Sequence, residues 1–373
     1  MSVPTISLII PCFNQGHFLR ACLDSISRQT YPYWEALVVN DGSTDITSSV
    51  AADYIARDAR FRYIEQPNLG LSGARNSGLE GVRGEFVLFL DADDWLEPKC
   101  LAVFVAAFHA QPDKLLYRCG YSYWDAPAGN KYHTHVPVAN GAIFPGVLTS
   151  NLGPCHSILI RRDFAMCLGD FDTRLKSCED WDFWIRAGRM GASIHSIPEV
   201  LVAYRYVANS MSRNPIVMYE ALTEVSRRAG EADDRLPDSA LHNKPTSLDY
   251  PSIQRKHLIV LLGVMLHQGR VEEAAKWYCR EQAKWIWEVR DEDWKGLASY
   301  LSWGYFFGLL DIEALLRETY PLVCQFFGDI GYGVSKSKRL AKMAFDAQLK
   351  KRNHLLFGRY TGAALNRLGI FPL

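Results

Sequence analysis

The sequence predicts an α/β fold with a mostly parallel sheet flanked by helices, followed by an all-helical C-terminal region. Strand-like and helix-like patterns alternate from residue 6 to about residue 112, as they do in folds built from βαβ units. From residue 253 onward the patterns are helical. The chain has 373 residues, of which 48% are apolar, so it can bury a sizeable core.

Short apolar runs mark the strands of the first region, and helical spacing marks the segments between them. The predicted strands are ISLIIP at 6–11, WEALVVN at 34–40, FRYIEQ at 61–66, EFVLFLD at 85–91 and SILIRR at 157–162. Helices are predicted over GLSGARNSGLEGV at 70–82 and SCEDWDFWIRAGRMG at 177–191. Residues 117–157 are rich in Gly, Pro, Asn and aromatic residues, which favours a binding loop or short hairpins.

A polar stretch from about residue 227 to 251 separates the two regions. We therefore expect an α/β domain at 1–226, a linker or irregular crossing at 227–252, and a helical domain with a basic tail at 253–373. The helices predicted in the last domain are 258–268, 271–289, 294–309, 312–327 and one from about 334.

Charge and cysteine usage argue against several classes of protein. The 41 Lys and Arg residues balance 41 Asp and Glu residues, whereas bulk nucleic-acid binding needs a strongly positive surface. The apolar runs are shorter than a bilayer span and the first residues do not resemble a signal peptide, so we expect a cytoplasmic protein. Nine scattered cysteines without a C-x-x-C pair fit free thiols, and not a disulfide framework or a structural zinc site.

The first of three acidic clusters contains Asp41, which directly follows the strand ALVVN. Open α/β sheets bind ligands at the carboxyl ends of their strands. The carboxylate of Asp41 can accept a hydrogen bond from an imide N–H, such as N3 of uracil. A turn followed by a helix cap explains the same residues equally well.

The second cluster, Asp91-Ala92-Asp93-Asp94, directly follows the strand FVLFL. Alternate carboxylates at the end of a strand suit Mg²⁺ or Mn²⁺, which keep open positions for phosphate oxygens. A solvated turn that caps the next helix explains one of these residues. It does not explain three crowded carboxylates, which repel one another unless a cation joins them. We therefore favour a metal site here.

The third cluster, Glu179 to Asp182, opens a predicted helix. The helix dipole stabilises an ionised carboxylate at this position, which suits a general base for a hydroxyl group. Capping of the first helical turn is the alternative for this cluster taken alone. No G-x-G-x-x-G follows the first strand and no G-x-x-x-x-G-K-[ST] occurs, which argues against a nicotinamide site and a P-loop.

Six segments in this order resemble the inverting family 2 glycosyltransferases of the GT-A fold, and they cover about residues 5–213. The segments are SLIIPCFNQGHFLRACLDSI, VVNDGSTD, GLSGARNSGL, FVLFLDADDWLEP, the pair FDTRL and CEDWDFWIRAGRMG, and YRYVANSMSR. The resemblance implies a transferase of the hexosyltransferase class that uses a nucleotide-diphospho-sugar, expected to be a UDP-sugar, with Mg²⁺ or Mn²⁺ as its cofactor. The implied acceptor is a hydroxyl group of a glycan, of a lipid-linked molecule or of another acceptor, as in polysaccharide biosynthesis.

The resemblance also assigns donor-side roles to the matching positions. Phe13 would stack on uracil, Asp41 would accept a hydrogen bond from uracil N3, and Arg75 would lie near the phosphates or nucleoside of the donor. In the D-x-D element, Asp93 is the expected direct metal ligand. Asp91 would face the ribose or a metal-bound water molecule.

On the acceptor side, the resemblance makes Asp180 of the Glu179–Asp180 pair the catalytic base. Glu179 itself and Trp181 would contribute to substrate binding. For Trp181 the reason is that aromatic faces suit sugar rings. For Trp184, core packing is the favoured interpretation.

One position departs from the family pattern. Many members have a His three residues after the Tyr in Y-R-x-H-x-x-S-x-S, and it contributes to the metal region. Val207 takes that place here, which implies either weaker metal binding or a ligand from another segment. A Q-x-x-R-W element is absent, so a transferase that adds one sugar at a time fits better than a processive polymer synthase.

The end of the chain is strongly basic. Residues 336–367 contain nine Lys or Arg residues and one acidic residue, Asp346, with apolar residues between them. Such a segment suits peripheral contact with the anionic inner face of a membrane, and hence a lipid-linked acceptor. A packed helix with a solvated basic face is the alternative. The aromatic residues of the helical region, such as Trp277, fit a homo-oligomer interface as well as a private core.

Two other functions stay open from the sequence. A non-catalytic nucleotide-sugar-binding or scaffold protein would act through its helical region, and Val207 is compatible with that role. The intact Asp91, Asp93 and Asp180 argue against it. A nucleotidyltransferase would need a Gly-rich loop with Arg or Lys after the first strand, and residues 12–17 do not provide one.

Overall fold

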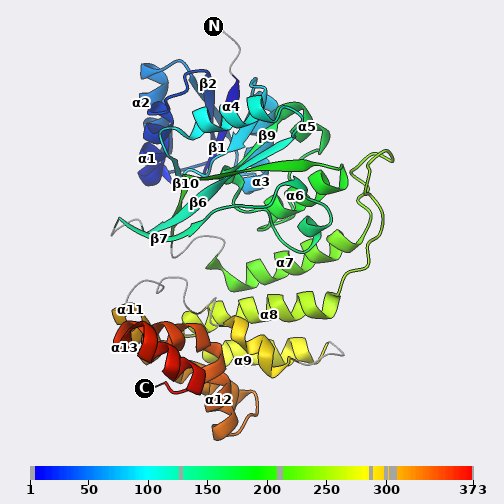
Figure 1. Cartoon of the computed structure of the whole chain (residues 1–373). Helices are drawn as coiled ribbons and strands as arrows, with labels where there is room; N and C mark the ends of the chain where they lie inside the picture. The colour runs from blue at the N-terminus through cyan, green and yellow to red at the C-terminus, as the bar shows by residue number, and fades with distance from the viewer. Residues whose placement is uncertain are drawn as a thin grey trace. The chain divides into compact units, whose positions relative to one another are not determined.

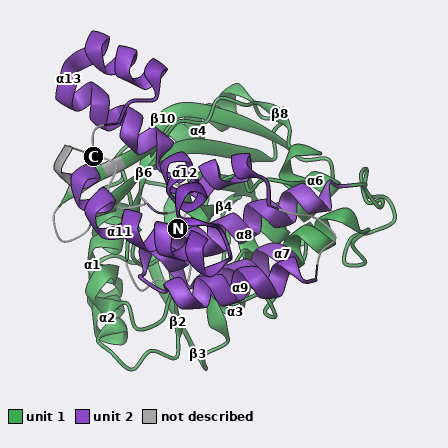
Figure 2. Cartoon of the chain, turned by 90° about the horizontal axis from the view of Figure 1, so that it is seen from below, with its two compact units in different colours: residues 1–208, 224–247 green, residues 209–223, 248–373 purple. Residues whose placement is uncertain are grey.

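The computed structural model of the chain describes residues 5–125, 129–207, 213–284, 289–297, 301 and 309–371. Contacts divide the chain into two compact units, which Figure 2 shows in green and purple. Unit 1 comprises residues 1–208 and 224–247, and unit 2 comprises residues 209–223 and 248–373. The domain boundaries expected at 226 and 252 stay predictions, which limited proteolysis can test.

Unit 1 is built on a mixed sheet that, within the described residues, has ten strands in the order β3-β2-β1-β4-β9-β6-β10-β5, with β7 paired to β6 and β8 to β10 (Figure 1). The strands are β1 (Ile6–Cys12), β2 (Trp34–Asp41), β3 (Phe61–Gln66), β4 (Phe86–Phe89), β5 (Trp95–Leu96), β6 (Leu116–Asp125), β7 (Asn130–His135), β8 (Gly141–Ala142), β9 (Ile158–Arg161) and β10 (Ser193–Tyr206). The neighbours β3, β2, β1 and β4 are parallel, so their carboxyl ends meet at one edge of the sheet.

Helices cover both faces of this sheet, and the alternation of side chains along β1 shows why. The helices of unit 1 are α1 (Gly16–Ser27), α2 (Thr47–Arg57), α3 (Gly70–Gly81), α4 (Cys100–Ala110), α5 (Arg162–Cys167) and α6 (Glu179–Arg189), with short 3-10 turns η1 (Gly146–Leu148) and η2 (Cys155–Ser157). Leu8 and Ile10 belong to the core shared with α1, α2 and α4. Ile9 points to the other face and contacts α3, because a Cβ added to Gly78 would lie 2.3 Å from the Ile9 side chain.

The prediction of a loop or short hairpins over 117–157 is only partly right. The hairpin exists, but its first strand, β6, is ten residues long and lies between β9 and β10 inside the sheet. Gly120 permits this close pairing, because an added Cβ would meet the carbonyl oxygens of His135 at 2.7 Å and Glu199 at 2.9 Å. The aromatic residues around Gly120 are good strand formers, and this preference outweighs the loop-like composition.

Unit 2 is helical, as the sequence predicts. Its elements are α8 (Tyr250–His267), α9 (Val271–Gln282), η4 (Asp291–Gly296), α11 (Leu309–Asp329), α12 (Val334–Ala344) and α13 (Asp346–Leu368). The buried core centres on the apolar run of α8, from Leu258 to Leu266, and includes Trp294 and Phe326. Among the described residues, no helix combines the length and the apolar character needed to cross a bilayer.

Helix α7 (Pro215–Gly230) belongs to both units. Its residues up to Thr223 group with unit 2, and those from Glu224 onward group with unit 1. The chain then runs without helix or strand through residues 231–249 before α8 begins.

Candidate active site

The loops that follow β1 and β2 are tied to each other at the carboxyl edge of the sheet. The backbone N–H of Asn14 donates to Ser43 Oγ at 2.9 Å, and Asn14 Oδ1 accepts from the backbone N–H of Thr44 at 2.9 Å. Asn14 has a φ of 52°, a left-handed conformation that Asn tolerates better than most residues. Next to it, the ring of Phe13 is 47% exposed. An aromatic face is therefore presented to solvent where parallel strands end.

Asp41 ends β2 and is buried. Its Oδ1 accepts from Gln66 Nε2 at 2.7 Å and from the backbone N–H of Leu69 at 2.8 Å, and its Oδ2 accepts from the N–H of Gly70 at 2.8 Å. These bonds fix the turn from β3 into α3. A carboxylate oxygen can accept two hydrogen bonds, so Oδ2 keeps capacity for one further donor.

Arg75 of α3 joins the end of β4 to the start of α6. Its guanidinium group is buried and forms ion pairs with Asp91 at 2.9 Å and with Glu179 at 2.6 Å. Two of the three predicted acidic clusters, far apart in the sequence, are thus held together by one cation. Arg suits this bridging position between two carboxylates, because its donors form a rigid planar fork.

The carboxylates after β4 are crowded. Burial and the neighbouring charge of Asp91 raise the pKa of Asp93 to about 6. Burial and the charges of Asp93 and Asp91 raise the pKa of Asp94 well above its usual range. Arg205 of β10 holds this loop: its backbone N–H donates to Asp94 Oδ1 at 2.6 Å, and its Nε donates to the carbonyl oxygen of Asp93 at 2.6 Å.

His156 of η2 faces the same loop, and sequence reasoning missed it. Its Nδ1 lies 3.1 Å from Asp94 Oδ2 and 4.0 Å from Asp91 Oδ2, and the ring is completely buried. Burial lowers the pKa of His156 to about 4, so the ring is neutral. Neither ring nitrogen has a well-aligned hydrogen bond within the described residues.

These residues fit a divalent cation. Ligand atoms of Asp91, Asp94 and His156 lie within 4.8 Å of one another. Carboxylate oxygens with one neutral imidazole nitrogen suit Mn²⁺, and carboxylates suit Mg²⁺. Asp93, the ligand that the resemblance implies, lies outside this group, beside Gln15. Asp91 is common to both ligand sets.

Asp180 stands at the start of α6, next to the Glu179–Arg75 ion pair. Burial and the charge of Glu179 raise its pKa to about 7. Asn151 Nδ2 lies 3.3 Å from each carboxylate oxygen of Asp180, and the backbone N–H of Trp181 donates to Oδ1 at 2.7 Å. A carboxylate held in this way titrates near neutral pH, which is what a general base requires.

The two Trp residues of α6 are both inside the protein. Trp181 is 4% exposed, and its indole N–H donates to the carbonyl oxygen of Val147 at 2.7 Å. Its ring therefore supports η1 and presents little surface to a sugar in this structure. Trp184 is completely buried, in agreement with the core packing predicted for it.

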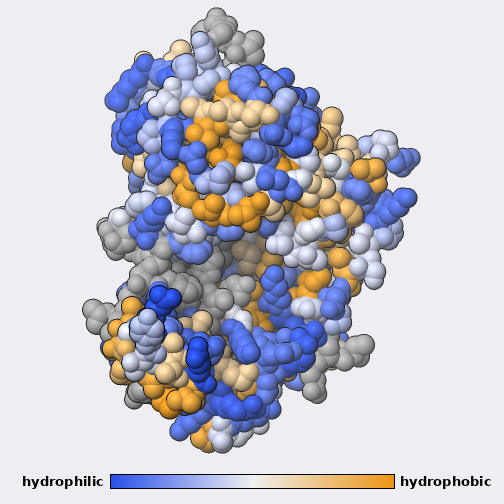
Figure 3. Space-filling view, viewed as in Figure 1, coloured by the Kyte–Doolittle hydropathy of each residue, from blue (hydrophilic) through white to orange (hydrophobic). Residues whose placement is uncertain are grey.

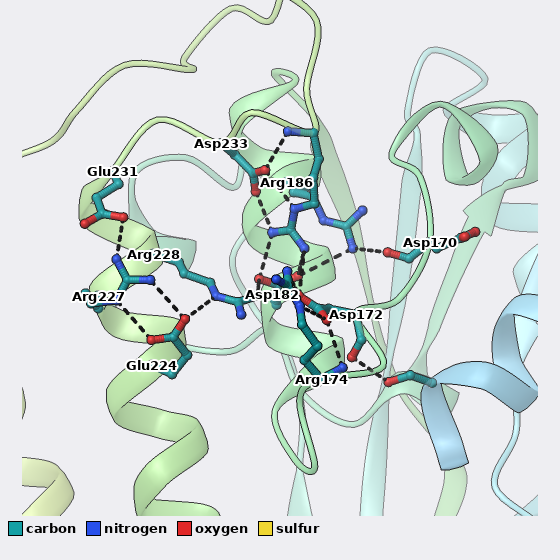
Figure 4. A network of polar contacts seen from close by, with 12 residues as sticks. Asp170, Asp172, Arg174, Asp182, Arg186, Glu224, Arg227, Arg228, Glu231 and Asp233 are labelled. Carbon is teal, nitrogen blue, oxygen red and sulfur yellow. Dashed lines mark hydrogen bonds and ion pairs between the residues drawn. The ribbon is translucent and has the colours of Figure 1, made fainter. Parts of the chain in front are cut away.

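An ion-pair network holds α6 through Asp182, two residues after Asp180 in the sequence, and Figure 4 shows Asp182 among the arginines that surround it. Asp182 is buried and pairs with Arg235 at 2.9 Å, with Arg228 at 3.3 Å and with Arg186 at 3.5 Å. Asp172 accepts from Arg228 at 2.8 Å in the same network. No motif in the sequence singles out these arginines, because their partners lie in distant segments.

The structure thus brings Arg75, Asp91, Glu179 and Asp180 together and places Asp93 and Asp94 in the adjoining loop. Asp41 ends β2, and Phe13 directly follows the neighbouring strand β1 at the same edge. Val207 ends the described part of the Y-R-Y-V segment, and residues 208–212 of that segment lie outside the described residues.

Comparison with known proteins adds independent findings. Residues 7–166 match the family model described as glycosyl transferase family 2. The chain is 32% identical over 226 residues to the uncharacterized glycosyltransferase EpsJ of Bacillus subtilis, covering 57% of this chain and 64% of that protein. It is 27% identical over 220 residues to the putative teichuronic acid biosynthesis glycosyltransferase TuaG of the same organism, covering 57% of this chain and 82% of that protein. The chain therefore spans less than two thirds of the length of EpsJ.

A similar solved structure is a mannosyltransferase from Pyrobaculum calidifontis, in complex with GDP-mannose and Mn²⁺. It is 17% identical in sequence, with a TM-score of 0.51, and the match covers 93% of this chain and 88% of that one. This likeness concerns the fold. Together with the sheet and its flanking helices, these matches show that the chain has a GT-A fold followed by a helical region, and that its residues 7–166 are similar to glycosyl transferase family 2.

Proposed function

We propose that the chain is a metal-dependent, inverting hexosyltransferase that moves one sugar from a nucleotide-diphospho-sugar to an acceptor hydroxyl group. One observation supports this most: Arg75 joins the carboxylates after β4 to Glu179, directly beside Asp180. A donor-side acidic loop and a carboxylate with a pKa of about 7 are thus neighbours in one site. The match of residues 7–166 to the family 2 model supports the same proposal.

For the donor, we propose a UDP-sugar. The exposed ring of Phe13 would stack on the base, and the remaining capacity of Asp41 Oδ2 would accept the N3 proton of uracil. The mannosyltransferase of similar fold binds GDP-mannose, so the choice of base rests on the VVNDGSTD segment of this chain. Asp93 and Asp91, or Asp91 with Asp94 and His156, would hold Mg²⁺ or Mn²⁺. When bound, this cation would offset the charge that develops on the departing diphosphate.

The residues of the chain then divide the remaining work. Asp180, as a carboxylate, takes the proton of the acceptor hydroxyl group. The oxygen of that hydroxyl group forms a bond to the anomeric carbon of the sugar. The bond from that carbon to the diphosphate oxygen breaks on the opposite face, and the nucleoside diphosphate leaves with the electron pair. One displacement inverts the anomeric centre. The hydrogen-bonded ion pair of Arg75 with Glu179 holds the first turn of α6 in place, which orients Asp180.

For the acceptor, we propose a hydroxyl group of a glycan or of a lipid-linked molecule. The similarity to TuaG, a putative teichuronic acid biosynthesis glycosyltransferase, supports a polysaccharide as the product. Asn151 and the turn that Trp181 supports lie beside Asp180 and would line the acceptor side. A cytoplasmic location, peripheral membrane contact and homo-oligomerisation remain proposals.

The test is release of UDP from a panel of UDP-sugars in the presence of Mn²⁺. We expect slow release with one sugar, loss of release with EDTA, and a decrease of about 10²–10⁴-fold in Asp180→Asn, which keeps the size of the side chain but not its basicity. Asp93→Ala should likewise abolish release, because it removes a proposed ligand of the cation. Asp53→Asn, a change at an exposed ion pair of α2, is the matched control and should be active.

The result also separates the alternatives. Calorimetric binding of UDP without turnover of any sugar would favour the non-catalytic nucleotide-sugar-binding protein. Absence of UDP binding, with binding of GDP, would correct the nucleotide and leave the transfer reaction in place. Absence of binding of any nucleotide would contradict the proposal.

A further inference from the structure

The last helix is a hairpin of two halves. Gly358, with φ 73° and ψ 178°, interrupts α13. Beyond it the chain turns back and packs on the first half. Asn353 Nδ2 in the first half donates to Asn366 Oδ1 at 2.9 Å and to the carbonyl oxygen of Ile370 at 2.9 Å. A Cβ added to Gly362 would lie 2.7 Å from the carbonyl oxygen of Asn353, so the two halves touch along their backbones. Figure 2 shows α13 at one end of unit 2.

The turn of this hairpin presents large apolar side chains to solvent. We call residues 355–360 the hairpin tip; its sequence is LLFGRY. The exposed fractions are 48% for Leu355, 41% for Leu356, 41% for Phe357 and 87% for Tyr360. A Cβ added to Gly358 would have no atom within 4 Å, so the turn itself is open as well. Soluble proteins rarely expose four such side chains together without a partner.

Basic residues surround the hairpin tip. Lys350, Lys351 and Arg352 precede it, Arg359 lies within it and Arg367 follows it. Lys350 pairs with Asp346 and Arg352 with Glu313, whereas Arg359 and Arg367 have no carboxylate within ion-pair distance among the described residues. Apolar and strongly hydrophilic residues are interspersed over the C-terminal helices in Figure 3.

We propose that the hairpin tip inserts into the interfacial layer of a membrane that contains anionic lipids. The apolar side chains would enter the layer between head groups and acyl chains, and the basic residues around them would meet lipid phosphates. The positive charge around the hairpin tip favours an anionic membrane as its partner over a second copy of the chain. A second copy would bring an equally basic tip to the interface. The inference specifies the membrane contact proposed above and does not depend on sugar transfer.

The test is co-sedimentation of the full chain with vesicles of phosphatidylcholine mixed with phosphatidylglycerol, compared with phosphatidylcholine alone. We expect binding to the anionic vesicles and a decrease in the partition coefficient of about tenfold or more in Leu356→Ser/Phe357→Ser. Arg359→Glu should weaken binding to anionic vesicles by about fivefold or more. Both changes are at exposed positions, so the fold should persist. Val138→Ser, at an 84% exposed apolar residue of unit 1, is the matched control and should bind normally.

Three results would overturn the inference. They are absence of binding to anionic vesicles, binding that is equal in the tip variants and the control, and a concentration-dependent dimer that the tip variants abolish while vesicle binding is absent. The last result would assign the tip to contact between copies. UDP release measured on the same samples keeps the outcome separate from the proposed reaction, because a tip variant that no longer binds vesicles should still release UDP in solution.

Discussion

At the scale of single residues, Asp180 has both a raised pKa and a fixed orientation. Burial and the charge of Glu179 raise its pKa to about 7, while Asn151 and the N–H of Trp181 keep the carboxylate oriented. A carboxylate with an ordinary pKa would be ionised at neutral pH but a weak base. Raising the pKa makes the ionised form more basic without removing it at the pH of a cell.

This gives a pH prediction. Only the ionised form of Asp180 accepts a proton, so the transfer rate at saturating donor should rise with pH up to about 7 and then level. Glu179→Gln removes the neighbouring negative charge, which should lower the pKa of Asp180 and move the rise to lower pH. Initial rates measured between about pH 5.5 and 8.5 check this. A flat profile, or a rise that Glu179→Gln leaves in place, would contradict the role of Asp180.

Part of the site could be predicted because its residues follow apolar runs directly. Asp41 and Asp91 each come next to an unmistakable strand, and parallel strands end at one edge. His156 could not be predicted, since a single His in an irregular segment has no spacing that relates it to Asp91 or Asp94. The pairing of β9 with β4, which the sequence does not display, brings the turn of His156 to the acidic loop.

At the scale of elements, α6 is held on two sides. Arg75 fixes its first turn through Glu179, and the network around Asp182 fixes the next residues. Arg189, near its end, is completely buried and donates to the carbonyl oxygens of His242 and Lys244 at 3.0 Å each. The helix that positions the proposed base is therefore fixed along its length.

The network around Asp182 gives a stability prediction. Asp182→Ala leaves the buried Arg186 with less compensation for its charge, which should lower the free energy of unfolding by about 3–5 kcal/mol. Asp53→Ala removes an exposed pair with Arg20 and should cost about 0–1 kcal/mol. Urea unfolding followed by circular dichroism compares the two. Equal losses in both variants would show that the network adds little to the stability of α6.

Helices and strands could be predicted from the sequence where one hydrophobic pattern dominates a segment. The prediction was incomplete where the pattern of hydrophobic residues and the composition of a segment point to different structures. The strands predicted over FRYIEQ and WEALVVN and the helix predicted over 70–82 agree with the structure to within a residue or two. In residues 231–249, the polar composition indicates solvent exposure. It cannot show that backbone carbonyls of this stretch hold Arg189, because such bonds do not depend on the side chains that the sequence displays.

At the scale of the whole molecule, each unit has its own core. One core lies between the sheet and helices α1, α2 and α4, and the other surrounds α8. The proposed nucleotide site lies entirely within unit 1. The two units should therefore respond differently to a ligand.

Scanning calorimetry tests this. We expect two thermal transitions, of which UDP with Mn²⁺ raises only one. At a ligand concentration a hundred times its Kd, that transition should gain about 2.7 kcal/mol of stability. A single transition that moves as a whole would show that the cores unfold together, and two unmoved transitions would contradict nucleotide binding.

Helix α7 limits how the chain can be divided. Near its start Tyr219 donates to Glu281 Oε2 of α9 at 2.9 Å, and near its end Arg228 pairs with Asp172 at 2.8 Å. No single cut therefore separates the units into two complete pieces, and a fragment that stops at residue 247 would retain Tyr219 without its partner. In a chimera that joins unit 1 to the helical region of a relative, the first half of α7 must therefore fit one parent and the second half the other.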